Sequence, residues 1–121
     1  MTSLVIGVGC SLGCPADELL SLIDATCPAG DVVVLATVDR RADEPGVVEA
    51  ARRRGWPLVT FPAEALAAVA VPTPSDVVAH HVGTPSVAEA AALLAAAPGR
   101  LVVPKHRSAH ATCAVASKEA R

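Results

Sequence analysis

The chain has 121 residues and a formal net charge of −2; 52% of its residues are hydrophobic and only 2% are aromatic. This length predicts one domain, the charge argues against nucleic-acid binding, and a core of alanine, valine and leucine favours closely packed layers. Because we find no apolar run of membrane-spanning length and no signal-peptide pattern, we expect a soluble, cytoplasmic protein that binds neither membranes nor nucleic acids.

The first predicted elements are a buried strand over residues 3–8 and a helix that begins near Pro15 and stops before Pro28. Residues 7–13 form a glycine-rich loop between them. The glycine spacing does not match the dinucleotide-binding pattern. Two interpretations stay open: backbone N–H groups that face an anion, or a plain strand-to-helix turn.

A second buried strand is predicted over residues 32–38, and it leads into a turn that is dense with charge. In open α/β sheets, ligands collect at the carboxyl ends of strands, so the stretch Thr37–Gly46 is the first candidate site. A helix over residues 47–54 follows, and the arginines at 52–54 are interpreted as its solvated end. The helix can be capped by Asp43 or Glu44.

The middle of the chain is predicted to alternate in the same way. The expected elements are a strand over residues 58–61, a helix from Pro62 to about Ala70, a bend at 71–74, and a short helix over 75–82. Ser86 and Glu89 have the spacing of a capping box, which predicts a helix from there to Ala97.

The last elements predicted are a strand over residues 101–103, a polar loop over 104–111 and a strand over 112–116. A loop this short permits a hairpin but not a helical crossover, so the fifth strand is expected to run antiparallel to the fourth. The whole pattern predicts a three-layer α/β/α sandwich with a mostly parallel five-stranded sheet. We expect one domain over residues 1–117 and a disordered tail over 118–121.

The four cysteines lack the spacing of a zinc site and are expected to be reduced thiols. Cys10 lies near the start of a helix, where a thiol can act as a nucleophile. A small apolar filler is the favoured interpretation of this residue, and a thiol enzyme is the last of our hypotheses.

The histidines stand at positions 80, 81, 106 and 110. The spacing of His106 and His110 resembles a helical pair of metal ligands, but Pro104 and Ser108 indicate a loop. We therefore expect each histidine to be a surface or hydrogen-bonded side chain, and we expect no metal and no cofactor.

The loop from Lys105 to Thr112 collects cationic and hydroxyl groups after a buried strand. Such a set suits the recognition of carboxylate or phosphate groups. A solvated hairpin tip explains the same residues equally well, and the spacing does not decide between the two interpretations.

Several segments, taken in order, resemble the CobE/CbiG C-terminal domain family of cobalamin (vitamin B12) biosynthesis. The resemblance covers nearly the whole chain, and its most specific parts are the acidic loop and the Gly-Thr-Pro-Ser-Val-Ala-Glu segment. The matching segments are residues 7–10, 36–39, 42–46, 82–90, 103–105 and 111–116.

The resemblance implies a role in making the corrin ring. The longer CbiG protein is a cobalt-precorrin-5A hydrolase, which opens a lactone on the macrocycle. This chain has the length of the C-terminal domain alone and so is most like stand-alone CobE, which is linked to the oxygen-dependent route. We expect a protein that acts on or binds a corrinoid or precorrin intermediate. The alternative is a non-catalytic partner domain that docks on another corrin-biosynthesis enzyme. The oligomeric state stays open, a homodimer included.

The resemblance also implies roles for particular residues. Cations at Arg41, Lys105 and Arg107 would hold the carboxylates of the macrocycle. Asp43 or Glu44 would activate water as a general base if lactone hydrolysis occurs. The hydroxyl groups of Thr84 and Ser86 would stabilise developing negative charge. The full set of expected substrate-binding residues is Gly9, Cys10, Thr37, Asp39, Arg41, Gly83, Thr84, Ser86, Lys105, Ser108 and Thr112.

The chain departs from the family pattern in three places. After the Gly-Cys pair it has Ser11, Leu12 and Cys14 where basic residues and a threonine are common. Arg40 and Arg41 replace a commoner leucine and lysine. In the last loop, His106, Ala109 and His110 replace glutamine, glycine and asparagine, while Lys105, Ser108 and Thr112 match.

Overall fold

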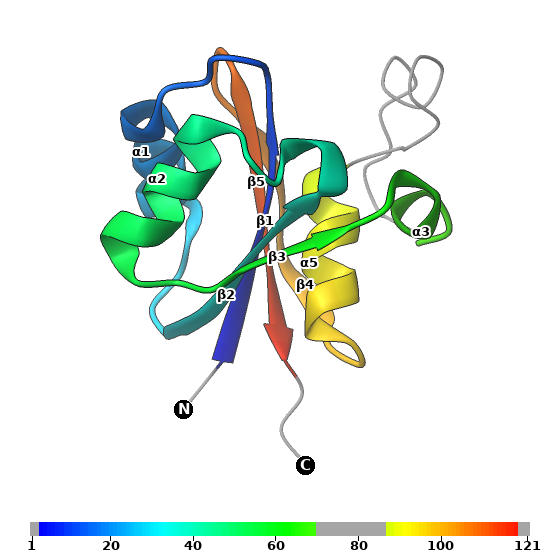
Figure 1. The fold of residues 1–121 in the computed structure, drawn as a ribbon. Coiled ribbons are helices and arrows are strands. Elements are labelled where there is room, and N and C mark those ends of the chain that lie inside the picture. Colours follow the sequence, from blue (N-terminus) through cyan, green and yellow to red (C-terminus); the bar gives the residue numbers. More distant parts are fainter. Residues whose placement is uncertain (1–2, 70–86, 119–121) are drawn as a thin grey trace.

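A five-stranded sheet lies between two helical layers (Figure 1) in this computed structural model, which describes residues 3–69 and 87–118. The strands are β1 (Ser3–Cys10), β2 (Asp31–Val38), β3 (Leu58–Phe61), β4 (Arg100–Arg107) and β5 (Ala111–Lys118). The helices are α1 (Ala16–Thr26), α2 (Pro45–Arg54), α3 (Ala63–Ala67) and α5 (Val87–Ala96), with a 3₁₀ turn η1 (Asp39–Arg41) after β2.

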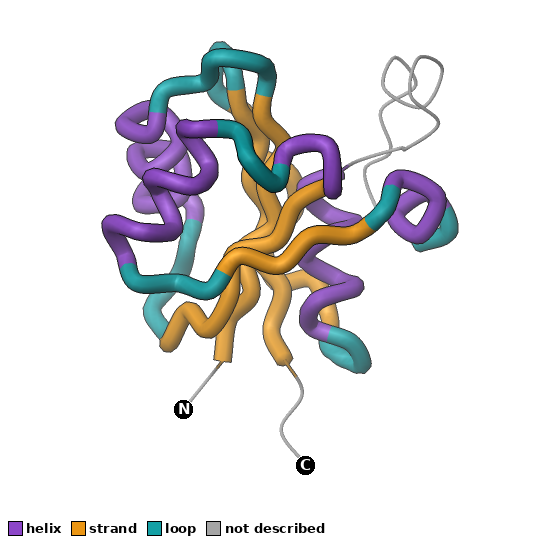
Figure 2. The backbone as a smooth tube through the Cα atoms, viewed as in Figure 1, coloured by secondary structure: helices purple, strands orange, loops and turns teal. Residues whose placement is uncertain are grey.

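The strand order is β3-β2-β1-β5-β4. Strands β1, β2 and β3 are parallel, and β5 runs antiparallel to both of its neighbours, β1 and β4. The predicted α/β sandwich and the antiparallel last strand are therefore confirmed. As a consequence, the carboxyl ends of β1, β2, β3 and β4 and the amino end of β5 lie at the same end of the sheet. Figure 2 shows the strands in orange, with helices in purple on both faces of the sheet.

The core has two halves, one on each face of the sheet. Leu4 and Ile6 of β1 pack in the cluster under α1 and α2, whereas Val5 packs in the cluster under α5, as the two-residue period of a strand requires. Contact with α5 is close because Gly7 has no side chain. A Cβ atom at Gly7 would lie 2.0 Å from the carbonyl oxygen of Ala88. The alanine-rich helix thus sits directly on the strand, which agrees with the expected closely packed layers.

The C-terminal hairpin is longer than predicted. Strand β4 continues to Arg107 and β5 begins at Ala111, so residues 108–110 alone form the loop. Most of the expected polar loop is therefore strand. Pro104 is tolerated there because β4 is an edge strand and its pairing with β5 is irregular at this point. At its other end β5 continues to Lys118, which pairs with Ser3.

Two other predictions differ from the structure. The helix expected from Pro62 to about Ala70 is the short α3, which ends at Ala67. Glu44 is the N-cap residue of α2, but its side chain makes no capping hydrogen bond. The bend predicted at residues 71–74 and the helix predicted at 75–82 lie outside the described residues, as do residues 119–121 of the expected tail. In the described part of the chain, no helix is long and apolar enough to cross a membrane.

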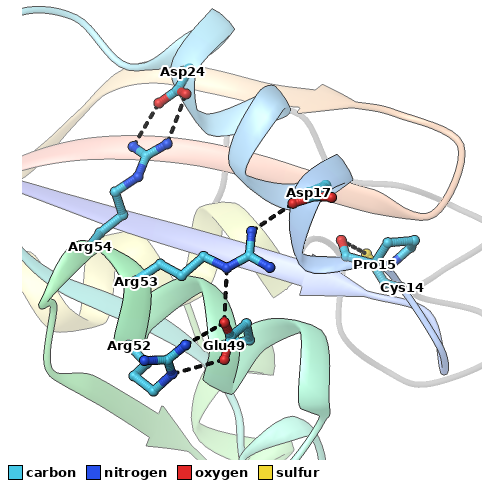
Figure 3. Close-up of polar contacts among 8 residues, drawn as sticks. All are labelled: Cys14, Pro15, Asp17, Asp24, Glu49, Arg52, Arg53 and Arg54. Atoms are coloured by element: carbon cyan, nitrogen blue, oxygen red, sulfur yellow. Dashed lines mark hydrogen bonds and ion pairs between the residues drawn. The ribbon is translucent and has the colours of Figure 1, made fainter.

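The arginine triplet joins α2 to α1 (Figure 3). Arg54 donates two hydrogen bonds to Asp24, at 2.8 and 2.9 Å, and Arg53 donates to Asp17 at 2.6 Å. Arg53 and Arg52 also donate to Glu49, one turn back on α2. The triplet is exposed at the helix end, as expected, but each guanidinium has a carboxylate partner.

Candidate functional site

One cavity lies at the sheet edge where the carboxyl ends of β1 and β4 meet the amino end of β5. Its volume is about 310 Å³. Residues from six segments line it: β1 and the loop after it, η1, the start of α5, β4, the β4–β5 loop and β5. The lining residues are Gly9, Cys10, Ser11, Arg41, Val87, Lys105, Arg107, Ser108, Ala109, His110, Ala111 and Thr112.

The cavity is positively charged. Arg41, Lys105 and Arg107 line it, and no acidic side chain is among the described lining residues. Across residues 3–69 and 87–118, none of these three cations forms an ion pair. Arg41 is held in place by a hydrogen bond of 2.7 Å from its Nε to the carbonyl oxygen of Cys10. The arrangement therefore favours an anionic ligand.

A glycine forms part of the cavity floor. A Cβ atom at Gly9 would lie 2.6 Å from Oγ1 of Thr112 on the neighbouring strand. The Thr112 hydroxyl is 3.5 Å from the carbonyl oxygen of Gly9, to which it donates a long hydrogen bond. The absence of a side chain at Gly9 thus leaves room for the threonine beside the cavity.

Glu18 of α1 anchors the β4–β5 loop through hydrogen bonds. The carboxylate accepts hydrogen bonds from the Ser108 hydroxyl and from the backbone N–H of His110, the latter at 2.7 Å. It also contacts Nδ1 of His110 at 2.8 Å. The Ser108 hydrogen bond, followed by those of His110, lowers the pKa of Glu18 to about 2. A charged carboxylate therefore fixes this wall of the cavity.

The buried Glu89 of α5 supports the part of the cavity lining that β4 forms. Its side chain is fully buried, and Oε2 accepts a hydrogen bond of 2.8 Å from the backbone N–H of Lys105. The sequence suggested only a capping role at the start of the helix for this glutamate. The structure adds a contact to the strand that carries Lys105.

Comparisons with known proteins agree with the resemblance in the sequence. The model of the family Cobalamin synthesis G C-terminus (CbiG_C) matches residues 4–116. The chain belongs to this family. It is a family of cobalamin biosynthesis, so the expected pathway is confirmed.

The chain covers very different shares of two relatives. The chain is 40% identical to Protein CobE of Sinorhizobium sp over 123 residues, which cover 93% of this chain and 79% of that protein. It is 32% identical over 118 residues to the cobalt-precorrin-5A hydrolase of Priestia megaterium, which again covers 93% of this chain but only 32% of the hydrolase. The chain thus matches about a third of the longer enzyme.

Solved structures have the same fold. The crystal structure of CobE, from the cobalamin (vitamin B12) biosynthetic pathway, superimposes with a TM-score of 0.87 at 30% identity and covers 96% of this chain and 90% of that one. The cobalamin biosynthesis protein chiG from Agrobacterium tumefaciens has a TM-score of 0.72 at 37% identity, with 97% and 99% of the two chains covered.

The cavity of this CbiG_C domain contains many of the residues expected to bind substrate. It brings together Gly9, Cys10, Arg41, Lys105, Ser108 and Thr112 from the expected set, and Arg107 with them. The Ser108 hydroxyl already donates to Glu18, so its oxygen rather than its proton is left for a ligand. Gly83, Thr84 and Ser86 lie outside the described residues, as do His80 and His81.

Four expected site residues lie away from the cavity lining. Thr37 is fully buried, and its hydroxyl donates to the carbonyl oxygen of Val8 at 2.8 Å. Asp39, the first residue of η1, and Asp43, two residues after η1, are exposed. Glu44 is 6% exposed and lines a second, shallow hollow between the amino ends of α1 and α2. Its Oε2 accepts the N–H of Gly13 at 3.0 Å.

The glycine-rich loop is a strand-to-helix turn rather than a cradle of free N–H groups. Besides the Gly13 bond, the N–H of Ser11 donates to the carbonyl oxygen of His110 at 2.9 Å, and that of Cys14 to Ser11 at 3.1 Å. These donors are therefore not available to an anion. Burial raises the pKa of the Cys10 thiol above its ordinary value, and Cys14 adds to the shift, which favours the filler interpretation over a nucleophile.

Sequence reasoning missed several residues of the site. Ser11, Val87 and His110 line the cavity, and Glu18 supports it. Of the two histidines in the described part of the chain, His106 is exposed and His110 contacts Glu18, as expected. Residues 18 and 110 are far apart in sequence, and nothing in their spacing indicates that they meet. No group of three or more possible metal ligands occurs in the described part of the chain.

Proposed function

We propose that the cavity binds the carboxylate-bearing edge of a corrinoid or precorrin intermediate of cobalamin biosynthesis. One observation carries the proposal: Arg41, Lys105 and Arg107 meet at a single cavity and have no carboxylate partner among the described residues. Cations left together at a solvent-open hollow repel one another, and an anionic ligand relieves that repulsion. The family supplies the chemical class of the ligand.

The contacts suit carboxylates in particular. The hydrogen bond to Cys10 uses only Nε of Arg41, which leaves its two terminal nitrogens to form a fork with two donors. Lys105 and Arg107 offer a second and a third cation from β4. The amino end of α5 adds a partial positive charge, because Val87, its first residue, also lines the cavity.

The dimensions favour binding at the edge of the macrocycle. A cavity of about 310 Å³ is at the small end of ligand sites, which reach about 1,000 Å³. A corrin-type ring is too large to be enclosed in it. We infer that peripheral carboxylates enter the cavity while the body of the ring stays at its open side.

Titration with hydrogenobyrinic acid, followed by the absorbance of the macrocycle, tests the proposal. We expect Lys105→Ala to weaken binding by about tenfold or more, because hydrogen bonds to charged groups contribute about 1.5–3 kcal/mol. Arg52→Ala is the matched control, since it removes the same charge from α2, away from the cavity lining. Absence of binding to the wild type at millimolar ligand, or equal loss in both variants, would contradict the proposal.

A second candidate function is a non-catalytic partner domain for another corrin-biosynthesis enzyme. The alignment supports it, because the chain corresponds to only 32% of the Priestia megaterium hydrolase and the longer enzyme carries this domain covalently linked to others. Co-purification with a corrin-biosynthesis enzyme, and no turnover of any intermediate by this chain alone, would favour this function. Turnover by the isolated chain would exclude it.

The general-base role of Asp43 or Glu44 stays a prediction for a lactone hydrolysis of the cobalt-precorrin-5A type. Asp43 is exposed and accessible to water, whereas Glu44 is 6% exposed and engaged with Gly13. An assay of lactone opening with Asp43→Asn and Glu44→Gln separates the two. Unchanged turnover in both variants would remove both residues from the mechanism.

A further inference from the structure

We propose that Glu89 is a positioning residue that fixes the strand register presenting Lys105 and Arg107 to the cavity. The inference rests on the proposed function of the cavity. Glu89 does not line the cavity itself, so its effect on a ligand passes through β4.

Strand β4 contains an extra residue where Lys105 lies. Val103 pairs with Val115 and His106 pairs with Cys113, so Pro104 and Lys105 stand opposite the single residue Ala114. This is the arrangement of a β-bulge, in which the extra residue leaves the regular ladder. Pro104 has no N–H to donate, and the N–H of Lys105 donates to Glu89 on α5.

The register of β4 decides which side chains reach the cavity. With the bulge, Arg107 pairs with Thr112, a cavity residue. If the pairing of Val103 with Val115 simply continued, His106 would stand opposite Thr112 instead. A shift of one residue moves side chains to the opposite face of a strand. Loss of the bulge would therefore withdraw two cations from the cavity.

An earlier irregularity in β4 shows that register changes of this kind turn side chains over. The pairing also shifts between Leu101 and Val103. Leu101 packs in the cluster under α5, whereas Val103 packs in the cluster under α1 and α2. Two residues that would share a face in a regular strand thus lie on opposite faces here.

Glu89 is well suited to hold the bulge at Pro104 and Lys105. Its side chain is fully buried, so its carboxylate must be compensated by hydrogen bonds rather than by water. It lies in the first turn of α5, where a negative charge is favoured, and α5 is packed directly against β1 through Gly7. An acceptor fixed in this way holds the N–H of Lys105 out of the ladder with β5.

The ligand test is a double-mutant cycle with Glu89→Gln and Lys105→Ala, again with hydrogenobyrinic acid as the probe. We expect each single variant to weaken binding by about tenfold. The double variant should bind more weakly than Lys105→Ala, because the altered register also withdraws Arg107, but by less than a further tenfold, because part of the effect of Glu89 passes through the Lys105 side chain. A further equal loss in the double variant would overturn the inference. Glu49→Gln, a change at a surface ion pair on α2, is the control and should bind as wild type.

A measurement without ligand separates this inference from the proposed function. In wild type the amide of Lys105 should be protected from hydrogen exchange, and in Glu89→Leu, which removes the acceptor, its protection should fall while that of Cys113 and Val115 in β5 persists. Unchanged protection of Lys105 in this variant would overturn the inference even if the ligand binds. If Glu89→Leu does not fold, Glu89→Asp, which keeps the charge and shortens the reach, should give the same local loss. Absence of ligand binding to the wild type would instead count against the proposed function alone.

Discussion

Two groups of three cations differ in one respect, the presence of carboxylate partners. Arg52, Arg53 and Arg54 are consecutive, and each is paired with a carboxylate of α1 or α2 (Figure 3). Arg41 is far in sequence from Lys105 and Arg107, yet the three meet at one cavity, and no ion pair compensates them in the described part of the chain. The conspicuous cluster in the sequence is structural, and the dispersed one is the candidate site.

A density of charge in the sequence therefore does not by itself identify a site. Exposed ion pairs contribute little free energy each, so the paired triplet stabilises the packing of α1 and α2 only modestly. Cations without partners destabilise the fold slightly and are explained by a ligand.

Reversal of one charge should have the largest effect on ligand binding, and only in the cavity group of cations. Lys105→Glu places a carboxylate beside the proposed ligand carboxylates, and repulsion of like charges at an interface costs several kcal/mol, so binding should fall on the order of 100-fold or more. Arg52→Glu changes the net charge equally but lies outside the cavity lining. Isothermal titration of both variants with the same corrinoid measures the difference. A similar loss in both would mean that only net charge matters.

Removal of Arg41 should have a smaller effect. Arg41→Ala deletes one cation and the hydrogen bond to the carbonyl oxygen of Cys10, and we expect binding to weaken by about tenfold. Arg41→Lys keeps the charge without the fork of donors and should lie between wild type and Arg41→Ala. Equilibrium binding of the three proteins at one salt concentration decides this. Unchanged affinity of Arg41→Ala for the ligand would remove this residue from the site.

The paired triplet should affect stability instead of binding. Arg54 makes two hydrogen bonds to Asp24, and its guanidinium carbon lies 5.7 Å from the centre of the Trp56 ring. Arg54→Ala should lower the free energy of unfolding by about 1 kcal/mol, since an exposed ion pair and a cation–π contact are each worth less than that. Urea denaturation measures this loss, and ligand affinity should stay unchanged.

The smallest expected effect is a dependence of stability on acid pH. Because the folded pKa of Glu18 is lowered to about 2 from an ordinary 4.5, its contribution to stability is complete above 4.5 and is lost as the pH falls towards 2. Glu18→Gln should therefore flatten the decline of stability in this window. The comparison is with Glu64→Gln, an exposed glutamate of α3. Melting temperatures between pH 5 and 2 provide the measurement; equal curves for the two variants would contradict the role of Glu18.

Much of the framework could be predicted from local patterns. The shortness of the last loop correctly required an antiparallel final strand. Arg41 follows β2, where a charged turn was predicted, whereas Lys105 and Arg107 lie in β4 and not in the predicted loop. The length of β4 could not be predicted, because Pro104 and the charged residues after it are typical of a loop. They are tolerated in a strand only because β4 is at the sheet edge and bulged.

The contacts made by the glutamates could not be predicted from the sequence. No role in the site was predicted for Glu18, yet its carboxylate accepts a hydrogen bond from the N–H of His110. Glu44 was expected to cap α2 or to activate water, but its Oε2 accepts the N–H of Gly13. Glu89 was expected to cap α5, and in the structure its Oε2 accepts the N–H of Lys105. Such contacts depend on how three layers pack together, and a periodic pattern along one element contains no information about them.

The position of β5 in the sheet has a consequence for the order of events during synthesis. This strand, the farthest along the described chain, lies between β1 and β4, so β1 leaves the ribosome long before this neighbour, which is made about a hundred residues later. Until then β1 exposes an unpaired edge of apolar residues, and no binding cavity exists. Nascent chains interrupted before residue 111 should therefore be targets for chaperones and proteases rather than partially active products.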